Sequence, residues 1–491
     1  MSLAVQLGVV GGYLAVALAV GLVAYRVAER TAEDYYLAGR TLGTVVLLFT
    51  TFATLLSAYT FFGGPDTVYA LGPEWILVMG LMDGVLFAVL WYVVGYKQWL
   101  VGRSGGYVTL GELLGDRFGS TGLRMFVAGV SLFWLFPYVM LQQKGAGLAL
   151  AGLTGGAVPL WVGAGAITLL MILYVVASGM RGVAWTDTLQ GLFMLGLVWV
   201  ALAWILSAVG GPAAATRALA ESNPEYLALG GGAYTPQFVL GTAAYIAFGV
   251  TMFPQINQRF FAARSKQVLQ RTFALWPVLV LLLFVPAFML GAWAAGLGVT
   301  VPEGESVLPV LLRTYTPTWF ASLVIAGALA AMMSSSDSML LSGASYLTRD
   351  LYRPLRGADH DSQPARETLL ARGGVAVFAT LSFVASLYAP GTLVEIGNTA
   401  FGGFAQLALP VVVALYWLQT TRAGMYAGLG LPQLFYLAAV FVPAVPDTYL
   451  GWPAAVVGMA LGLVLTVGVS AVTTQDTDEK TAVVFEGIQA D

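Results

Sequence analysis

Apolar runs long enough to cross a membrane recur from one end of this sequence to the other. A bilayer core of about 30 Å needs roughly 20 apolar residues per helix, and backbone polar groups inside lipid must be satisfied locally. Each run is therefore predicted to be a transmembrane helix. We predict thirteen of them, at residues 3–25, 42–71, 74–100, 121–151, 157–178, 186–209, 236–261, 270–298, 317–348, 370–389, 394–418, 423–443 and 450–473.

The amino-acid composition agrees with this interpretation. Hydrophobic residues make up 58% of the 491 residues and charged residues only 10%, whereas a soluble domain carries about 25% charged residues. So few charges cannot cover a water-facing surface, and residues 1–474 are predicted to form one integral membrane domain. The first run lacks a basic leader, so it is interpreted as a span rather than a cleaved signal.

Several chemistries are excluded by what the sequence lacks. It contains no cysteine, and its single histidine, His360, lies in a charged segment. Disulfides, thiol chemistry, iron–sulfur centres and histidine-ligated haem are therefore excluded.

The basic residues are distributed unevenly between the predicted loops. If the loop after the first span is cytoplasmic, that side holds 19 of the 22 lysines and arginines. The other side holds only Arg217 and Arg313, and Lys144 lies inside a span. This positive-inside bias predicts a protein of the cell membrane with its N-terminus outside and its C-terminus in the cytoplasm. The acidic tail, residues 475–491, is predicted to be disordered there.

Two predicted spans contain helix-breaking and polar residues. Span 42–71 carries hydroxyl residues followed by Gly63 and Pro65, and span 236–261 carries Gly249, Pro254 and Gln255. Such residues are tolerated at membrane depth where backbone lines a cavity, and interrupted helices at corresponding places in two halves indicate a transporter built from inverted repeats. The two spans are five apart, which predicts repeats at 42–209 and 236–418. Close packing of Gly-rich and Ser-rich helices is the open alternative.

The span at 317–348 contains four serines and a carboxylate between residues 334 and 338. These groups are costly in lipid and need a polar partner, and a hard cation such as sodium prefers oxygen ligands of this kind. A break in span 42–71 would free carbonyls near Ala53 and Leu56, while Ser334 and Ser335 would offer hydroxyls. Alternatively, the serine hydroxyls bond to their own helix.

A further carboxylate, Asp187, lies near the start of span 186–209. It can cap that helix, where the dipole favours a negative charge. The other interpretation places Asp187 on an intracellular ion path.

Four stretches together resemble a known family, the sodium:solute symporters, over essentially the whole chain. They are residues 33–40, residues 182–190 with Trp185-Thr186-Asp187, residues 258–265, and residues 333–338 followed by 348–352. The resemblance implies an all-α integral membrane fold of the leucine-transporter type. Its five-plus-five inverted-repeat core would carry one extra N-terminal helix and two extra C-terminal helices.

The same resemblance implies a sodium ion as the co-transported species. Its ligands would be the carbonyls of Ala53, Leu56 and Ala331 and the hydroxyls of Ser334 and Ser335. Some members bind a second ion nearer the cytoplasm, and that site or exit path maps to Asp187, Asp337 and Ser338. Asp337 is a departure, because other members often have a hydroxyl or an apolar residue there.

The substrate positions depart from two branches of the family. The aspartate of proline transporters is replaced by Leu55, and the sugar-binding residues of sugar transporters are replaced by Thr60, Met79 and Met82. A hexose needs many directed hydrogen bonds, which argues against a sugar. The Pro254-Gln255 pair is more similar to the pantothenate and monocarboxylate branch. The candidate substrate-binding residues are Ser57, Thr60, Gly63, Pro254, Gln255 and Lys144.

Two of the embedded charges have open roles. Lys144 follows Gln142 and Gln143 and can pair with an anionic substrate or extend to the outer interface. Asp83, in span 74–100, can make a structural hydrogen bond or act in function.

The predicted function is sodium-coupled symport of a carboxylate, pantothenate or amino-acid-like solute by alternating access. The protein would not be an enzyme, would bind no nucleic acid, and would act as a monomer in the lipid bilayer. A proton-coupled transporter of the same fold is one alternative. A respiratory-type membrane subunit is another, but it needs lines of intramembrane Lys, Glu and His.

Overall fold

The computed structural model describes residues 3–27, 31–228, 230, 232, 234–357 and 364–474. His360 and the predicted tail at 475–491 lie outside these residues. The elements of the first part, with η marking short 3-10 or π helices, are α1 Leu3–Val27, α2 Ala32–Leu37, η1 Ala38–Arg40, α3 Thr44–Leu55, η2 Tyr59–Gly63, α4 Gly64–Leu71, η3 Leu77–Asp83, α5 Gly84–Leu90, η4 Trp91–Gly95, α6 Tyr96–Gly105, α7 Leu110–Arg117, α8 Thr121–Thr154 and α9 Leu160–Ala208.

The second part is also helical apart from one small ribbon. Strands β1 and β2 pair antiparallel ahead of the last helix. The elements are α10 Pro212–Ser222, η5 Pro224–Leu227, α11 Pro236–Thr251, α12 Pro254–Ala262, α13 Lys266–Gly296, α14 Val307–Tyr315, α15 Thr318–Ser345, η6 Tyr346–Tyr352, α16 Arg353–Arg356, α17 Pro364–Ser386, α18 Leu393–Tyr416, α19 Arg422–Phe441, β1 Thr448–Tyr449, β2 Trp452–Pro453 and α20 Ala454–Val472.

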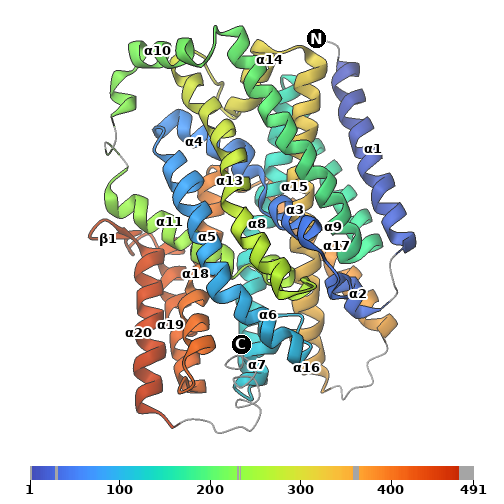
Figure 1. Cartoon of the computed structure of the whole chain (residues 1–491), viewed down its shortest axis with the longest axis vertical. Helices are drawn as coiled ribbons and strands as arrows, with labels where there is room; N and C mark the ends of the chain where they lie inside the picture. The colour runs from blue at the N-terminus through green and yellow to red at the C-terminus, as the bar shows by residue number, and fades with distance from the viewer. Residues whose placement is uncertain are drawn as a thin grey trace.

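The helices form an elongated bundle that matches the predicted spans in order (Figure 1). Within the described residues, ten helices are long and apolar enough to cross a membrane, and counting each of two bent pairs as one span gives twelve. The predicted span 157–178 corresponds to a shorter apolar helix, Leu160–Leu173. The all-helical membrane architecture is confirmed, whereas the number thirteen stays a prediction.

The helix ends differ from the predicted boundaries where charged residues stand near the interface. α13 begins at Lys266, four residues before the predicted start, because the Ser265 side chain caps it by accepting from the Val268 N–H. The helix that contains α15 continues through η6 into α16. Hydropathy marks the part of a helix that lies in lipid, so it misses turns that project beyond it.

Both predicted interruptions are present. α3 and the η2–α4 helix meet at an angle of 62°, and α11 and α12 meet at 55°. Pro254 stands at the first turn of α12, where its missing N–H costs no hydrogen bond. A Cβ atom at Gly249, just before the second break, would lie 2.2 Å from the Phe401 carbonyl oxygen. The bend in α11–α12 therefore packs directly against the backbone of α18.

Two further predicted spans, 157–178 and 186–209, are joined in one long helix, α9, with a kink at Gly179. Gly179 has φ 58° and ψ −165°, which only glycine adopts without strain. A Cβ atom there would lie 2.7 Å from the Tyr35 ring. The kink thus allows α2 to pack closely against α9.

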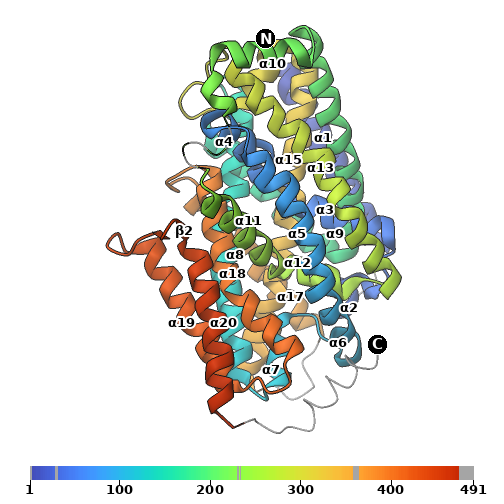
Figure 2. The same cartoon turned by 60° about the vertical axis from the view of Figure 1, so that its left-hand side comes forward.

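The centre of the bundle is α15, which is buried along almost its whole length. It packs against α1, α3, α8 and α9. α1 lies at one edge of the bundle, while α19 and α20 pack together beside α18 at another edge (Figures 1 and 2). Polar side chains of α15 therefore face protein rather than lipid.

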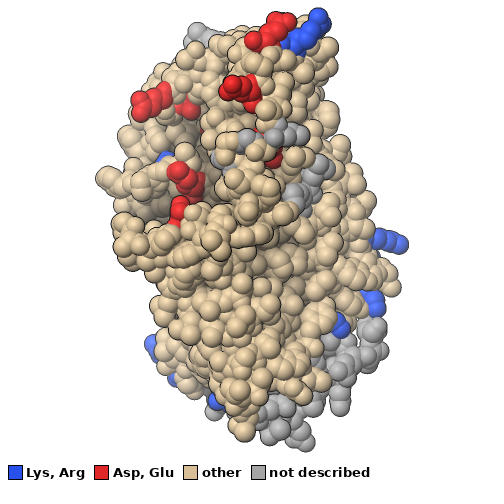
Figure 3. Space-filling view, turned by 90° about the vertical axis from the view of Figure 1, so that its left-hand side faces the viewer, with Lys and Arg blue, Asp and Glu red and all other residues tan. Residues whose placement is uncertain are grey.

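Acidic and basic side chains are distributed unevenly over the molecule. On the face in Figure 3, acidic residues lie in the upper half, and most basic residues lie in the lower half or at the right-hand margin near mid-height, with one basic group at the very top and a smaller one among the acidic residues. Much of the rest of this face is uncharged, as expected for a surface that contacts lipid tails.

Candidate functional site

The broken end of α3 meets the serine-rich turn of α15 at the centre of the bundle. The Ser334 hydroxyl donates to the Ala53 carbonyl at 2.6 Å and to the Ala331 carbonyl of its own helix at 3.1 Å. The Ser335 hydroxyl donates to the carbonyls of Thr54, at 2.9 Å, and Leu56. The structure thus brings together all five residues predicted to hold sodium, and three of the four hydroxyl contacts cross between helices.

The chemistry of this cluster suits a hard cation. Its candidate ligand atoms are carbonyl and hydroxyl oxygens, all from buried residues. The carbonyls of Ala53, Thr54 and Leu56 lie at the C-terminal end of α3, where unpaired C=O groups carry the negative end of the helix dipole. Each serine hydroxyl can turn its lone pairs toward an ion. The residues present therefore fit a sodium ion.

A second buried cluster lies one turn further along α15. The Asp187 carboxylate accepts from the Thr50 hydroxyl at 2.6 Å and pairs with the Arg259 guanidinium at 3.3 Å. The same guanidinium nitrogen donates to the Ser338 hydroxyl at 2.5 Å. Ser338 also contacts the Thr54 hydroxyl at 2.9 Å. Asp187 therefore joins α9 to α3 and α12, and it does not cap a helix in this structure.

Arg259 corrects the loop assignment made from the sequence. It was counted among the cytoplasmic basic residues, but it lies in α12 with only 1% of its surface exposed. Arg259 stands at the end of a predicted span, and hydropathy cannot distinguish an arginine at the membrane surface from one that is paired inside the membrane. In the sequence, the one feature that could have indicated a buried ion pair was the carboxylate of Asp187 near another predicted span.

Asp337 was expected beside Asp187 and Ser338. It is fully buried, and within the described part of the chain neither of its oxygens has a hydrogen-bond partner. Asp187 and the Tyr13 hydroxyl of α1 lie within electrostatic range of it. Asp337 is thus near the second cluster but outside its hydrogen-bond network.

A cavity of about 30 Å³ lies between the two breaks. Its lining includes Ser57 and Thr60 from the first broken span and Ile246 and Val250 from the second. Since one water needs about 10–15 Å³ on this measure, the cavity has room for water but not for an organic solute. The structure therefore shows this cavity in a form too small for a solute.

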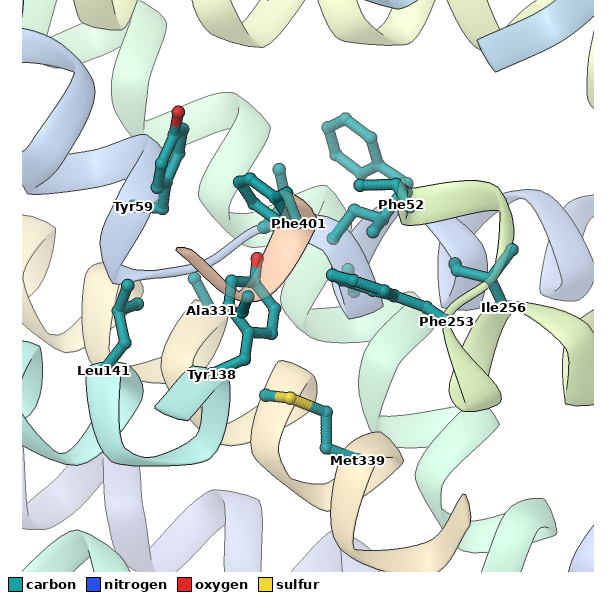
Figure 4. Packing of buried hydrophobic residues seen from close by; sticks show 14 of the residues in the cluster. Phe52, Tyr59, Tyr138, Leu141, Phe253, Ile256, Ala331, Met339 and Phe401 are labelled. Atoms are coloured by element: carbon teal, nitrogen blue, oxygen red, sulfur yellow. The ribbon is translucent and has the colours of Figure 1, made fainter. Parts of the chain in front are cut away.

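Aromatic rings close this region. The Phe401 ring lies 5.1 Å from Tyr59, 5.2 Å from Tyr138 and 5.6 Å from Phe253 between ring centres, and Figure 4 shows these side chains grouped around the break. The Tyr138 hydroxyl donates to Ser57 at 3.3 Å. These rings come from four different helices, so sequence spacing could not have identified them as neighbours.

Gln142 is another residue whose role the sequence did not reveal. Its side-chain oxygen accepts the Ala58 N–H at 2.9 Å, at the point where the first broken span resumes. A broken helix leaves such N–H groups without intrahelical partners. Gln142 therefore stabilises the break from the neighbouring helix α8.

Of the six predicted substrate residues, only Ser57 and Thr60 line the cavity. Pro254 and Gln255 begin α12, and both polar atoms of the buried Gln255 amide lack a partner among the described residues. A Cβ atom at Gly63 would lie 2.9 Å from Val394, so this glycine serves close helix packing.

Lys144 lies away from the cavity. Its ammonium donates to the carbonyls of Ala389, at 2.9 Å, and Gly391, at 2.7 Å, and so fastens the α17–α18 loop. This geometry agrees with the interpretation in which Lys144 extends toward the interface.

Comparisons with known proteins agree with this geometry. The model of the family described as "Sodium:solute symporter family" matches residues 35–431. The chain is 28% identical to the sodium/pantothenate symporter of Escherichia coli, over 90% of this chain and 94% of that protein. It is 28% identical to the sodium/proline symporter of Haemophilus influenzae, over 84% and 83%. It is 25% identical to a monocarboxylate transport permease protein of Rhizobium johnstonii, over 81% of each.

Solved structures share the fold. A Na+-coupled sialic acid symporter superposes with a TM-score of 0.79 at 21% identity, covering 96% of this chain and 98% of that one. Mhp1, a nucleobase-cation-symport-1 family transporter in a closed conformation, superposes with a TM-score of 0.61 at 16% identity, covering 92% and 98%.

Proposed function

The chain belongs to the sodium:solute symporter family, and on this premise we propose that it takes up a small organic acid or amino-acid-like solute by alternating access. Sodium is the co-transported ion. The relatives and neighbours named above are transporters rather than enzymes. The observation that carries the proposal is the pair of hydroxyls, Ser334 and Ser335, that bond to the carbonyls at the broken end of α3.

Sodium would bind where these hydroxyls meet the carbonyls of Ala53, Leu56 and Ala331. An ion held there links α3 to α15, so it binds most tightly in the conformation where those helices are close together. A ligand shifts a conformational equilibrium only by its difference in affinity for the two states. Sodium entry would in this way favour the state that accepts solute.

Asp187, Asp337 and Ser338 fit an exit path better than a second sodium site. The Arg259 guanidinium already donates to Ser338 and pairs with Asp187, so these two oxygen ligands have a resident cation. An ion that leaves the first site toward the cytoplasm would pass this polar cluster. The proposed sodium stoichiometry is therefore one.

The solute would bind in an expanded form of the cavity between the breaks. Ser57 and Thr60 line this cavity, the Gln255 amide without a partner among the described residues follows the second break, and the remaining walls are largely apolar. Pockets of this kind fix a ligand with a few polar contacts against apolar walls. The relatives named for pantothenate, proline and monocarboxylate support a solute with a carboxylate.

The proposed topology has thirteen helices with the N-terminus outside and the C-terminus in the cytoplasm, in a monomer of the plasma membrane. Two bent helix pairs support a core of two five-helix repeats, at 42–209 and 236–418. The positions of α1 at one edge and of α19 and α20 at another support one extra helix before the core and two after it.

Uptake into proteoliposomes tests this function. Solutes from the carboxylate, pantothenate, amino-acid and sugar classes are each presented with an inward gradient of sodium, of potassium or of protons. We expect one class other than sugars to accumulate with the sodium gradient alone. Accumulation driven by a proton gradient without sodium would instead support a proton-coupled transporter of the same fold.

A further inference from the structure

One buried carboxylate has no role in the proposed ion pathway. Asp83 ends η3 and has none of its surface exposed. Within the described residues, neither of its side-chain oxygens has a hydrogen-bond partner. The structural hydrogen bond that the sequence allowed for Asp83 is therefore not made in this conformation.

Asp83 stands between two residues of the same span that line the cavity, although Asp83 itself is not part of the lining. Met79, four residues earlier, and Phe87, four residues later, both line the cavity. The cavity-lining Tyr59 and the buried Tyr245 of α11 lie within electrostatic range of the carboxylate. These two tyrosine hydroxyls are the titratable groups that face it, and no base among the described residues exerts a comparable effect on it.

An uncompensated carboxylate at this depth needs a proton or a cation. Unpaired charges in a membrane interior are costly, and they are found paired or at substrate and ion pathways. Arg259 already pairs with Asp187, and Lys144 already bonds to the α17–α18 loop. Neither of these basic side chains is therefore available to Asp83, and a cationic group of a ligand could pair with it.

The walls around this position suit an ammonium group. Aromatic rings of Tyr59, Phe87, Tyr138, Trp276 and Phe401 line the cavity, and the faces of such rings attract cations. None of the described residues that line the cavity is basic. A plain carboxylate would therefore meet only a like charge here, whereas an amine would find both a carboxylate and aromatic faces.

We propose that Asp83 binds the ammonium group of the transported solute, so that the substrate class is an amine-bearing acid rather than a simple carboxylate. This proposal rests on the proposed function, since it concerns the solute of the same transport cycle. The amine would pair with Asp83 when the cavity widens to admit the solute, while the carboxylate end would lie nearer the break at Ser57 and the sodium site.

Solute binding by the purified full-length protein tests the proposal, with thermal shift in sodium and in potassium as the readout. L-proline and L-alanine are compared with cyclopentanecarboxylate and propionate, which keep the carboxylate and lack the amine. In sodium, we expect wild-type protein to bind L-proline more tightly than cyclopentanecarboxylate, or L-alanine more tightly than propionate. The difference in affinity should be about tenfold or more, as expected for one charge-assisted contact. Asp83→Asn should abolish that preference.

The unfolding temperature of Asp83→Asn and its response to sodium alone show whether this variant is folded. Asn has nearly the same shape as Asp and no charge, so Asp83→Asn should unfold at the wild-type temperature or above it, and it should keep the stabilisation by sodium alone. Asp116→Asn, at the lower end of the bundle, is a matched control that should leave amine preference unchanged.

Three results would overturn the proposal. The first is binding of the amine-free compounds as tight as that of the amines, and the second is no response to any amine. The third is full amine preference in Asp83→Asn, which is the result expected if Asp83 holds a proton. None of these results affects the response to sodium alone, whereas loss of that response in wild-type protein would count against the proposed function.

Discussion

Two neighbouring serines differ from a third in what their hydroxyls contact. Those of Ser334 and Ser335 reach across to α3, while the Ser336 hydroxyl donates to the Met332 carbonyl of its own helix at 2.7 Å. All three are fully buried on the same helix. Contact with another helix, rather than burial or residue type, therefore distinguishes the candidate ion ligands.

This difference gives a matched test of the sodium site. Ser334→Ala with Ser335→Ala removes two oxygen ligands and should abolish sodium-stimulated uptake in proteoliposomes. Ser336→Ala removes only a bond within the helix and should keep sodium stimulation within about twofold of wild type, since such back-bonds contribute little. Unchanged sodium dependence in the double variant would reject the site assignment.

At the same scale, Arg259 and Asp187 show why a charge in a predicted span needs the structure for its interpretation. Removing one partner of a buried pair leaves an uncompensated charge, which costs about 3–5 kcal/mol. The buried charges of Arg259 and Asp187 therefore compensate each other only while both side chains are present. Asp187 alone suggested a cation path, and Arg259 alone suggested a loop, because their proximity depends on how α9 packs with α12.

At the scale of the elements, the breaks arise where the chain offers both a helix breaker and a close neighbour. Gly249 lies against the Phe401 carbonyl, and Gly179 lies against Tyr35. The breaks in spans 42–71 and 236–261 were predictable from Gly and Pro residues in apolar runs. The kink at Gly179 was not predicted, because a single glycine between two spans looks the same as a short loop.

The kink at Gly179 can be tested by substitution. Gly179→Ala places a side chain at φ 58° and 2.7 Å from Tyr35, and residues in such conformations cost about 1–3 kcal/mol. Thermal unfolding of the purified protein should shift downward accordingly.

Gly196, in the same helix, provides the control. No heavy atom lies within 4 Å of a Cβ atom at this position. Gly196→Ala should therefore leave the unfolding temperature unchanged or raise it slightly, because alanine is the better helix former. Equal effects of the two substitutions would show that the Gly179 conformation is not required.

At the scale of the whole molecule, charge distinguishes the two ends. The lower end also carries a buried ion-pair network in which Glu112 of α7 pairs with Arg349 at 2.6 Å and with Arg124 at 3.1 Å. Burial acts to raise the pKa of Glu112, but the two arginines and the Val108 N–H together hold this pKa below its usual value. Opening of the lower end would have to separate these charges or move them together.

The orientation of the bundle can be tested because the chain contains no cysteine. A single cysteine at the exposed position of Arg217, in α10, should react with a membrane-impermeant maleimide on intact cells. A single cysteine at the exposed position of Arg356, in α16, should react only after the membrane is permeabilised. The opposite pattern would reverse the proposed topology, and unsubstituted protein provides the blank.

The sequence by itself determined that the chain lies in a lipid bilayer. It also determined the order of the helices and the positions of the two broken spans. These properties depend on composition and on local breakers, which act on residues close together in the chain. The family resemblance added the five candidate oxygen ligands, which the structure brings together at the broken end of α3.

Only the tertiary structure decided which polar side chains meet. Arg259 pairs with Asp187, Gln142 accepts the Ala58 N–H where the broken span resumes, and Asp83 has no hydrogen-bond partner among the described residues. Each of these outcomes depends on the distance between helices far apart in sequence. Inside a membrane the cost of a buried charge is set by such a partner or by its absence, and no local pattern in the chain contains that information.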